Sequence, residues 1–377
     1  MRLGFPAVPP RVLIVTASVG EGHDAPARAL ADQLRSERPD VEVVTEDCLP
    51  VMGSAVSALS QGAARVVFYR FLWAWDVAFW VFARFAPTRA LTQRALTRLG
   101  SRGLLELIAA RDPDVIVSVY PNATEVLGRL RTAGKLTIPV CAVITDVAGL
   151  HYWATRGADL HLVTHPESIE EVHAIAGPDA EVHCVHGFTK AIFLAPRPTR
   201  EARRALGLDP DARLVLVSGG GWGVGALEEA ASEVLSIDGV GQVVCLCGRN
   251  ERLAAHLAQR FAGDPRVRVE GFTDQMSDWL AAADALVHST GGLTVLEALM
   301  RGCPAISYGW GRGHVRLHNA AFRRFGLAQV AATPTALRAA VAAALAQGRT
   351  AAEFSMLPSA ASFVLARAEQ ARLADAA

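Results

Sequence analysis

The chain has 377 residues, of which 51% are hydrophobic, and its 37 lysines and arginines balance 37 acidic residues. This charge balance excludes a general electrostatic attraction to nucleic acid, and the length indicates two domains rather than one. The six cysteines show no Cys-x-x-Cys spacing, which indicates buried free thiols in a reducing cytoplasm rather than a zinc site. Residues 1–10 lack the apolar core of a secretory signal.

Short apolar runs alternate with helical patterns along the chain, which is typical of βαβ units and parallel sheets. In the first half we expect strands at Val12–Thr16, Val41–Val44, Val115–Val119, Val140–Thr145 and Leu160–Val163. In the second half we expect them at Leu214–Ser218, Val243–Cys247, Val267–Val269, Ala285–His288 and Ala305–Tyr308. The proline-bearing segment Leu194–Arg200 is interpreted as a linker. The sequence predicts two doubly wound, Rossmann-like α/β domains that face each other across a cleft.

A glycine segment follows the first expected strand. Gly20, Gly22 and Ala25 match the G-x-G-x-x-G/A fingerprint of dinucleotide-binding proteins, and Glu46 and Asp47 follow the next strand. One hypothesis is therefore an NAD(P)-binding oxidoreductase that uses the Gly20 loop.

His23 lies in the same loop, although no dinucleotide contact requires it. At the carboxyl edge of a parallel sheet, a histidine can exchange a proton with a ligand near neutral pH. The alternative is a turn histidine with a structural role.

The segment Ala64–Ala86 is the most aromatic part of the chain and contains Trp73, Trp75 and Trp80. Charged residues at positions 70, 76 and 84 interrupt it, so it is not expected to span a bilayer. Between residues 61 and 102, seven arginines stand against one aspartate. Tryptophan beside arginine suits a helix lying on an anionic membrane surface. The alternative is an amphipathic helix packed within the first domain.

Two Asp-x-Asp motifs, Asp112–Asp114 and Asp209–Asp211, each precede an expected strand directly. This places them at the amino edges of the sheets, away from the carboxyl edges where ligands bind. We interpret them as turn residues rather than as metal ligands.

A second glycine loop follows the strand that ends at Ser218, with five glycines in the seven residues 219–225. Glycine is costly in chain entropy, so this run indicates backbone amides that approach a phosphate or a sugar. A flexible hinge loop is the alternative.

The segment His288–Pro304 indicates the end of a strand, a glycine turn and a helix whose first turn carries Glu297. The start of a helix offers unpaired N–H groups and a partial positive charge to a pyrophosphate, and Gly291 and Gly292 allow close approach. Glu297 would then accept hydrogen bonds from a ribose. The alternative is a capping box formed by Thr294 and Glu297.

Five motifs occur in one order, at residues 20–23, 219–225, 247–250, 271–284 and 291–304. Together they resemble the monogalactosyldiacylglycerol synthase and processive diacylglycerol glucosyltransferase family, which is related to the peptidoglycan-precursor N-acetylglucosaminyltransferase. The resemblance spans about residues 12–326. It implies a GT-B architecture, with an acceptor and membrane-facing domain at 1–195, a nucleotide-sugar domain at 196–349, and a C-terminal helix within 350–377 that returns to the first domain.

The resemblance also implies a set of site residues. On the acceptor side, His23 is the candidate base, Asp146 is its partner or orients the acceptor, and Gly22, His151 and Trp153 line the site. The implied donor-binding residues are Gly219, Gly220, Gly221, Arg249, Phe272, Thr273, Met276, Gly291, Gly292, Thr294, Glu297 and Asn319. Within this set, Arg249 is placed near the phosphates, and Phe272 and Thr273 beside the uracil. The acidic or amide pair that family members carry before Asn319 is missing here, so the identity of the donor sugar stays open.

The implied reaction is an inverting hexosyl transfer from a UDP-sugar to a membrane lipid such as diacylglycerol, with no metal and no other cofactor. The helix start near Thr294, the loop amides and Arg249 would stabilise the departing diphosphate. The implied partners are the UDP-sugar, the lipid and an anionic membrane surface, with no nucleic acid, at the inner face of the membrane. A polyprenyl-linked acceptor and a catalytically inactive lipid-sensing protein remain alternatives.

Overall fold

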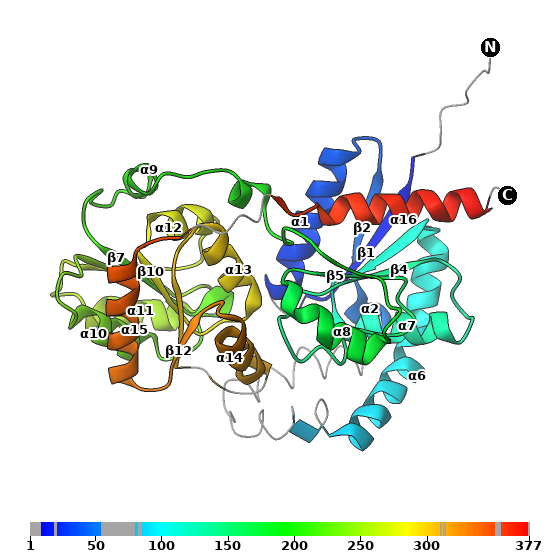
Figure 1. The fold of residues 1–377 in the computed structure, drawn as a ribbon, viewed down its shortest axis with the longest axis horizontal. Helices are drawn as coiled ribbons and strands as arrows, with labels where there is room; N and C mark the ends of the chain where they lie inside the picture. The colour runs from blue at the N-terminus through cyan, green and yellow to red at the C-terminus, as the bar shows by residue number, and fades with distance from the viewer. Residues whose placement is uncertain are drawn as a thin grey trace, which may run out of the picture. The chain divides into compact units, whose positions relative to one another are not determined.

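A computed structural model describes residues 9–18, 21–53, 80–81, 85–309, 311, 314–350 and 356–375. The chain divides into two compact units, the first made of Met1–Thr189 with Met356–Ala377 and the second of Lys190–Ser355 (Figure 1). Over the described residues, each unit contains a six-stranded parallel sheet. Both divisions fall six residues from the bounds of 195 and 349 that the sequence suggested.

The first sheet has the order β2-β1-β3-β4-β5-β6. Its strands are β1 Arg11–Thr16, β2 Glu42–Asp47, β3 Val115–Ser118, β4 Val140–Val143, β5 Leu160–Val163 and β6 Val182–Cys184. In register, Val12 of β1 lies between Val43 of β2 and Val115 of β3. The direction of winding reverses between β1 and β3, and such a switch point is where open α/β sheets bind ligands.

Helices cover both faces of this sheet. They are α1 Glu21–Glu37, α2 Cys48–Val51, α6 Ala86–Arg111, α7 Pro121–Thr132, α8 Ile169–Ala176 and α16 Ala360–Asp375, with a short 3-10 turn η3 at Pro166–Ser168. Apolar side chains of α1 and α16 pack with one face of the strands, and those of α2, α6 and α7 pack with the other. Proline in the first turn of α6 and of α7 suits a helix start, where its missing N–H has no intrahelical partner.

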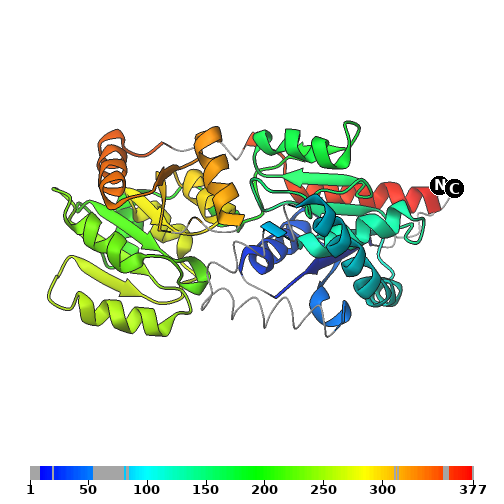
Figure 2. The same ribbon diagram turned by 90° about the horizontal axis from the view of Figure 1, so that it is seen from below.

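The helix α16, drawn in red, lies with the blue and green elements of the first unit in Figures 1 and 2. Its Ala360, Ala361, Val364 and Ala368 are fully buried in the core shared with α1. Ion pairs from Arg38 to Glu369 and from Arg367 to Glu181 fasten its exposed side. The core of the first unit therefore includes residues from both ends of the chain.

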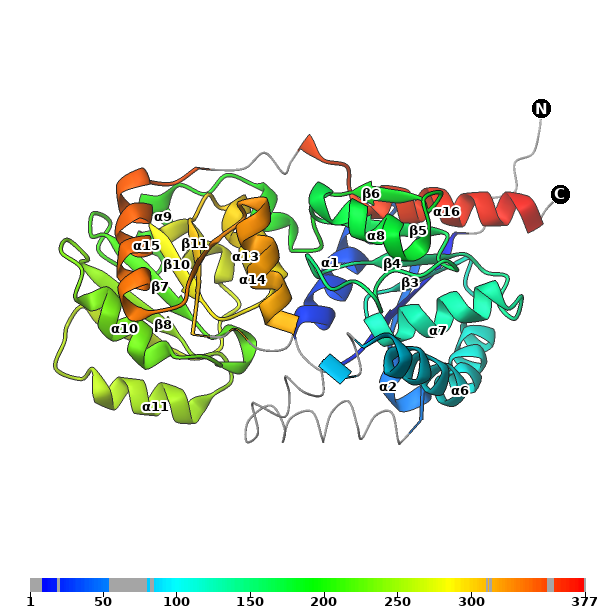
Figure 3. The same cartoon turned by 60° about the horizontal axis from the view of Figure 1, so that its bottom comes forward.

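The second sheet has the order β12-β11-β10-β7-β8-β9, with its switch point between β7 and β10. Its strands are β7 Leu214–Ser218, β8 Gln242–Leu246, β9 Val267–Glu270, β10 Ala285–His288, β11 Ala305–Tyr308 and β12 Gln329–Ala331. The helices are α9 Thr199–Ala205, α10 Leu227–Leu235, α11 Glu251–Arg260, α12 Met276–Ala282, α13 Gly292–Met300, α14 His314–Phe325 and α15 Pro334–Gln347, with 3-10 turns η4 Ala191–Leu194 and η5 Gly220–Trp222. Figure 3 shows α10 and α15 on one face of the sheet and α13 and α14 on the other.

The expected strands are all present, and four of them, β5, β7, β10 and β11, have the expected bounds. Two strands were missed, β6 and β12. Each has only three residues and lies at the edge of a sheet, so neither shows the buried apolar run that marks the others. The expected linker Leu194–Arg200 packs within the second unit, where Arg197 pairs with Asp278 and Arg301 donates to the carbonyl oxygen of Ala195.

The aromatic segment falls largely outside the described residues, and with it Trp73 and Trp75. Trp80 is described; its side chain is 57% exposed and stacks on Phe85 with ring centroids 5.4 Å apart. Among the helices that the structure describes, none is long and apolar enough to cross a bilayer.

Candidate functional site

The second unit brings its two glycine segments together at the switch point of the sheet. Strands β7 and β10 are neighbours, and Ser218 lies opposite His288 in their register. The glycine loop 219–225 therefore begins beside the segment 289–292 that leads into α13. Loops at the carboxyl ends of parallel strands on either side of a switch point form the usual ligand crevice.

The glycines of the loop 219–225 are explained by the loop's own geometry. Gly220, Gly223 and Gly225 have φ angles of 66°, 58° and 103°, the left-handed region that favours glycine. A Cβ on Gly223 would overlap the carbonyl oxygen of Cys247, and one on Gly219 would stand 2.6 Å from the amide nitrogen of Val224. The inference that a ligand must account for this run of glycines was therefore wrong for these positions.

Hydrogen bonds fasten this loop to its neighbours. Asn250 donates from Nδ2 to the carbonyl oxygen of Gly223 over 3.0 Å, and the amide of Arg249 donates to Gly221 over 2.9 Å. From the other side, the hydroxyl of Ser289 donates to the carbonyl oxygen of Val224 over 2.5 Å. Hydrogen bonds to residues on both sides thus hold the loop in place.

The start of α13 has a different character. Gly291 is the N-cap, with φ −91° and ψ −160°, and among the described side chains none caps this helix. The helix begins at Gly292, so Thr294 is its third residue and Glu297 its sixth. The capping-box alternative is wrong, because Thr294 is inside the helix, and Glu297 lies in the second turn rather than the first. A Cβ built on Gly291 would meet no atom of the described residues within 4 Å.

Arg249 and Phe272 form a stacked pair beside the loop. Phe272 is 45% exposed, and the guanidinium carbon of Arg249 lies 3.7 Å from the centroid of its ring. The hydroxyl of Thr273 accepts hydrogen bonds from the indole of Trp279 and from the amide of Gln275. The structure thus joins Phe272 and Thr273 in one turn before α12, with the Thr273 side chain engaged internally.

Asn319 on α14 is buried, and its Oδ1 accepts a hydrogen bond of 2.7 Å from the hydroxyl of Ser307 at the end of β11. This bond brings α14 to the same sheet edge as the residues above.

His288 is a buried residue that the sequence did not single out. Its Nδ1 lies 3.2 Å from the amide nitrogen of Thr290, and its Nε2 is buried without a hydrogen-bond partner among the described residues. Burial, with a smaller contribution from His318, lowers the pKa of His288 to about 4. Its position at the carboxyl end of a predicted strand is the feature from which the sequence could have indicated His288 as a residue near the site.

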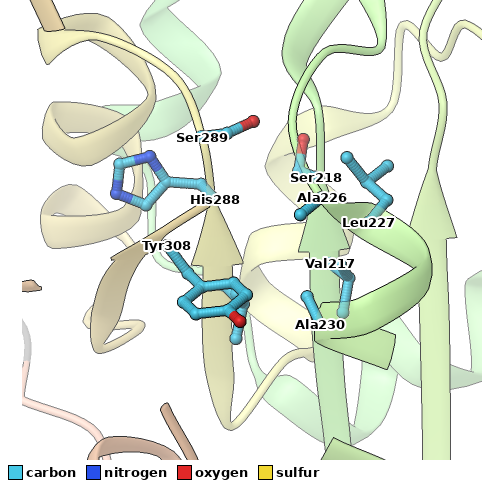
Figure 4. A pocket seen from close by; sticks show the side chains of 9 residues that line it. Val217, Ser218, Ala226, Leu227, Ala230, His288, Ser289 and Tyr308 are labelled. Carbon is cyan, nitrogen blue, oxygen red and sulfur yellow. The ribbon is translucent and has the colours of Figure 1, made fainter. Parts of the chain in front are cut away.

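A small pocket lies beneath the glycine loop, between the ends of β7, β10 and β11 and the start of α10 (Figure 4). Tyr308 and Ala230 border it, while the ring of His288 points to the other face of the sheet, where Phe322 lies. Its empty volume is about 160 Å³ including the open mouth. Pockets for small ligands usually measure about 300–1,000 Å³, so this one is too small for a nucleotide sugar.

In the first unit, His23 lies in the first turn of α1, not in a loop, and Gly22 and Ala25 are helical as well. Its Nδ1 is 3.1 Å from the carbonyl oxygen of Val119, which directly follows β3. A carbonyl oxygen only accepts, so Nδ1 carries the proton and Nε2 keeps its lone pair. His23 thus bridges the switch point between β1 and β3.

Two aromatic residues pack against His23. The ring of Tyr120 meets it edge to face at 5.2 Å, and Trp153 lies at 5.6 Å. Burial lowers the pKa of His23, and the negative charge of Asp146 opposes this shift. Tyr120 was not singled out from the sequence, although its place after a buried strand at the same sheet edge gave a usable signal.

Asp146 and Trp153 are joined by a hydrogen bond of 2.9 Å from the indole Nε1 to Oδ2, and Trp153 is buried. The carbonyl oxygen of His151, between them, accepts from the side chain of Gln93 on α6. The structure thus brings His23, Asp146 and Trp153 together, with His151 close in sequence.

The acidic residues of the dinucleotide fingerprint are engaged elsewhere. Glu46 and Asp47 lie inside β2 and do not follow it. Glu46 pairs with Arg111, and Asp47 caps α2 by accepting from the amide of Leu49 over 2.9 Å. The oxidoreductase hypothesis requires a carboxylate that binds the ribose hydroxyls of the dinucleotide, and both candidate carboxylates are engaged with other groups.

Both Asp-x-Asp motifs lie at the amino ends of strands, as expected. Asp114 accepts a hydrogen bond of 2.6 Å from the amide of Arg11, and Asp112 ends α6 and pairs with the Arg11 guanidinium. In the second motif, Asp211 pairs with Arg200. These carboxylates stabilise turns before β3 and β7.

Two family models match the chain. Residues 23–187 match the model for monogalactosyldiacylglycerol synthase, and residues 213–347 match that for glycosyl transferases group 1. The matched stretches hold the two sites described above.

Individual proteins are also similar. A probable chloroplastic monogalactosyldiacylglycerol synthase 2 of Oryza sativa subsp. indica is 29% identical over 320 residues, which cover 78% of this chain and 65% of the rice protein. A processive diacylglycerol beta-glucosyltransferase of Staphylococcus saprophyticus is 26% identical over 336 residues, which cover 88% of this chain and 84% of that protein. The chain thus spans slightly under two thirds of the plant relative and most of the bacterial one.

Among solved structures, MurG of Acinetobacter baumannii has a TM-score of 0.59 at 17% identity, covering 96% of this chain and 100% of MurG. The Os79 protein of O. sativa has a TM-score of 0.60 at 14% identity, with the same coverage. At these identities the likeness concerns the fold, two Rossmann-like domains in the GT-B arrangement.

Proposed function

Because residues 23–187 match the model for monogalactosyldiacylglycerol synthase and residues 213–347 match that for glycosyl transferases group 1, we propose that the chain is a glycosyltransferase of the monogalactosyldiacylglycerol synthase and processive diacylglycerol glucosyltransferase family. It transfers a hexosyl group from a UDP-sugar to a membrane lipid such as diacylglycerol, with inversion and without a metal. The observation that carries this proposal is the start of α13, which has glycine as its N-cap and lies at the switch point of the second sheet.

The donor binds at the second unit. The N–H groups in the first turn of α13 and the helix dipole hold the diphosphate, and Gly291 leaves room for its oxygens. Glu297 accepts from the ribose hydroxyls. The exposed ring of Phe272, with Arg249 stacked on it, borders the base. Asn319, which accepts a hydrogen bond from Ser307, is assigned to the sugar side.

The acceptor binds at the first unit, where His23 is the base. Its Nε2 takes the proton of the acceptor hydroxyl as that oxygen forms the new bond to the anomeric carbon. The bond from this carbon to the diphosphate breaks on the opposite side, so the configuration inverts and UDP leaves. A lowered pKa keeps Nε2 unprotonated in the resting protein, and Asp146 stabilises the imidazolium that forms. The helix dipole of α13 stabilises the departing diphosphate.

The first unit also meets the membrane. Leu91 and Leu99 on α6 are 65% and 57% exposed, and the same helix exposes Arg94 and Arg98. Apolar and cationic side chains on one helix suit an anionic lipid surface. Trp80, exposed just before this helix, adds an interfacial aromatic. We propose that the chain binds the inner face of the membrane, where anionic lipids would attract these arginines.

Nucleotide binding tests the class of protein. UDP should raise the melting temperature of the full chain and NAD should not, because a ligand stabilises only the fold that binds it. Stabilisation by NAD alone would overturn the proposal.

Product formation tests the reaction. The chain is incubated with a panel of UDP-hexoses and vesicles that contain diacylglycerol or a polyprenyl phosphate, and lipids are identified by mass spectrometry. A hexosyl-diacylglycerol is expected, and His23→Ala should lower turnover about 100-fold or more with unchanged UDP affinity. Transfer only to the polyprenyl lipid would reassign the acceptor, and no product from any donor would refute the activity.

A further inference from the structure

The segment 146–153 carries three candidate acceptor-site residues but has no regular secondary structure of its own. Its two ends are linked, because Trp153 donates from Nε1 to Asp146, and Trp153 in turn packs against His23. The buried N–H and C=O groups of an irregular segment lack the regular pairing of a helix or a sheet, so side chains or other backbone groups must supply their hydrogen-bond partners. The placement of Asp146 and Trp153 relative to His23 therefore depends on what binds the backbone between them.

The start of α8 supplies those partners. Ser168, which precedes α8, donates from Oγ to the carbonyl oxygen of Val147 over 2.9 Å and is buried. Glu171, in the first turn of α8, accepts from the amide of Leu150 over 2.9 Å and from the amide of Gly149 over 3.1 Å. Its second oxygen is 3.2 Å from the same Gly149 amide.

One carboxylate thus holds two consecutive N–H groups at the centre of the segment. Gly149 has a φ of 82°, so the chain turns sharply here and presents both N–H groups to the same acceptor. Hydrogen bonds to an ionised carboxylate are shorter and stronger than those between neutral groups. On the α6 side, the contact from Gln93 to the carbonyl oxygen of His151 is longer, at 3.5 Å.

From this geometry we propose that Glu171 is a positioning residue for the acceptor site. It fixes the backbone of Gly149 and Leu150, and through them the place of Trp153 and Asp146 beside His23. This inference rests on the proposed function only where it assigns the site to the acceptor. The hydrogen bonds between Glu171 and the segment 146–153 lie entirely within the first unit. Glu171 touches no reacting atom in this scheme.

The test uses Glu171→Ala and Glu171→Gln in the full chain, with Glu170→Gln as the matched control. Glu170 and Glu171 share the first turn of α8, so both interact favourably with the helix dipole, and it is Glu171 whose carboxylate accepts from the amides of Gly149 and Leu150. We expect Glu171→Ala to lower kcat/KM for diacylglycerol about tenfold or more, because it removes bonds to a charged group. Glu171→Gln, which keeps one acceptor oxygen, should lower it less. The KM for the UDP-sugar and the parameters of Glu170→Gln should stay within about twofold of wild type.

Hydrogen exchange gives a second readout that needs no activity. The amides of Gly149 and Leu150 should exchange faster in Glu171→Ala than in the wild type and in Glu170→Gln, while those of the first sheet stay protected. Unchanged exchange at these amides would overturn the inference. So would donor and acceptor KM values that rise together, because that pattern indicates a general loss of structure. If the wild type transfers no sugar, the proposed function fails, and exchange at Gly149 and Leu150 still decides whether Glu171 holds the segment.

Discussion

Two glycine segments meet at the same edge of the second sheet, and their glycines exist for different reasons. In the loop 219–225, positive φ angles and crowded neighbours require glycine at positions such as Gly223, whatever binds nearby. At Gly291, by contrast, φ is ordinary for any residue, and within the part of the chain that the structure describes a Cβ would meet nothing within 4 Å. The fold requires glycine in the first segment, whereas at Gly291 the described residues leave open space.

This difference distinguishes glycines that the backbone conformation requires from a glycine that leaves room for a ligand. A run of glycines in a sequence is compatible with both, because glycine serves tight turns and close ligand approach alike. Only the surroundings of each Cα distinguish the two cases. The open space at Gly291, at the start of a helix without a side-chain cap, is the stronger argument for a diphosphate, although it lies in the less glycine-rich segment.

The largest effect should come from the crowded loop. Gly223→Ala combines a left-handed backbone angle with a clash against the carbonyl oxygen of Cys247. We expect it to lower the free energy of unfolding by about 3 kcal/mol or more, measured by urea denaturation. Gly263→Ala is a suitable control, because a Cβ there would meet no described atom within 4 Å. Equal stability of the two variants would break the comparison.

The pH dependence of stability should test the role of His288, which precedes the segment around Gly291. His288 accepts from the amide of Thr290, and its pKa is lowered to about 4. Between pH 6.5 and about 4 the unfolded chain binds a proton that the folded chain excludes, so stability falls as the pH is lowered through this window and levels off below it. The loss assigned to His288 is about 2 kcal/mol between pH 7 and pH 5. Urea titrations of wild type and His288→Gln should show a shallower pH dependence in the variant, and equal slopes would contradict this account.

Gly291→Ala should reverse the pattern of Gly223→Ala. The free energy of unfolding should change by about 1 kcal/mol or less, since the backbone is unstrained and only a preference at the N-cap is lost. The affinity for UDP should fall about tenfold, because the new methyl group occupies the space assigned to the diphosphate. Calorimetric titration measures the affinity, and an unchanged dissociation constant would remove Gly291 from the donor site.

A smaller effect is expected for Glu297→Ala. The structure excludes a capping role for this residue, so its loss should act on the nucleotide. We expect UDP to bind about fivefold more weakly, in line with the loss of a hydrogen bond between a carboxylate and a ribose. Glu251→Ala, in the first turn of α11, serves as the control. Equal affinities of the two variants would show that Glu297 does not contact the ribose.

Much of the fold followed from the sequence, because the central strands are buried on both faces and appear as continuous apolar runs. The run Leu214–Ser218 has five buried residues and was found with correct bounds. The edge strand β12 has three residues of mixed burial and gave no such signal. Helix starts were less accurate, as at Thr294, because the N-cap is a glycine instead of a residue with a capping side chain.

The site was only partly predictable, for a different reason. The order of the strands places His23 and Asp146 at one sheet edge, and the sequence anticipated this. The contacts that set their chemistry come from residues distant in the chain, such as the carbonyl oxygen of Val119 that fixes the tautomer of His23. The crowding of Gly223 by Cys247 is of the same kind. No local pattern in the sequence encodes these pairings.

The position of α16 has a consequence for biosynthesis. Its apolar residues complete a core whose other members precede residue 190, yet the ribosome synthesises this helix after the whole second unit. During translation, the second unit is complete in sequence while one face of α1 still lacks its covering helix. Domains usually fold from the N-terminus as they emerge. Here the first unit can reach its final packing only after α16 has left the exit tunnel.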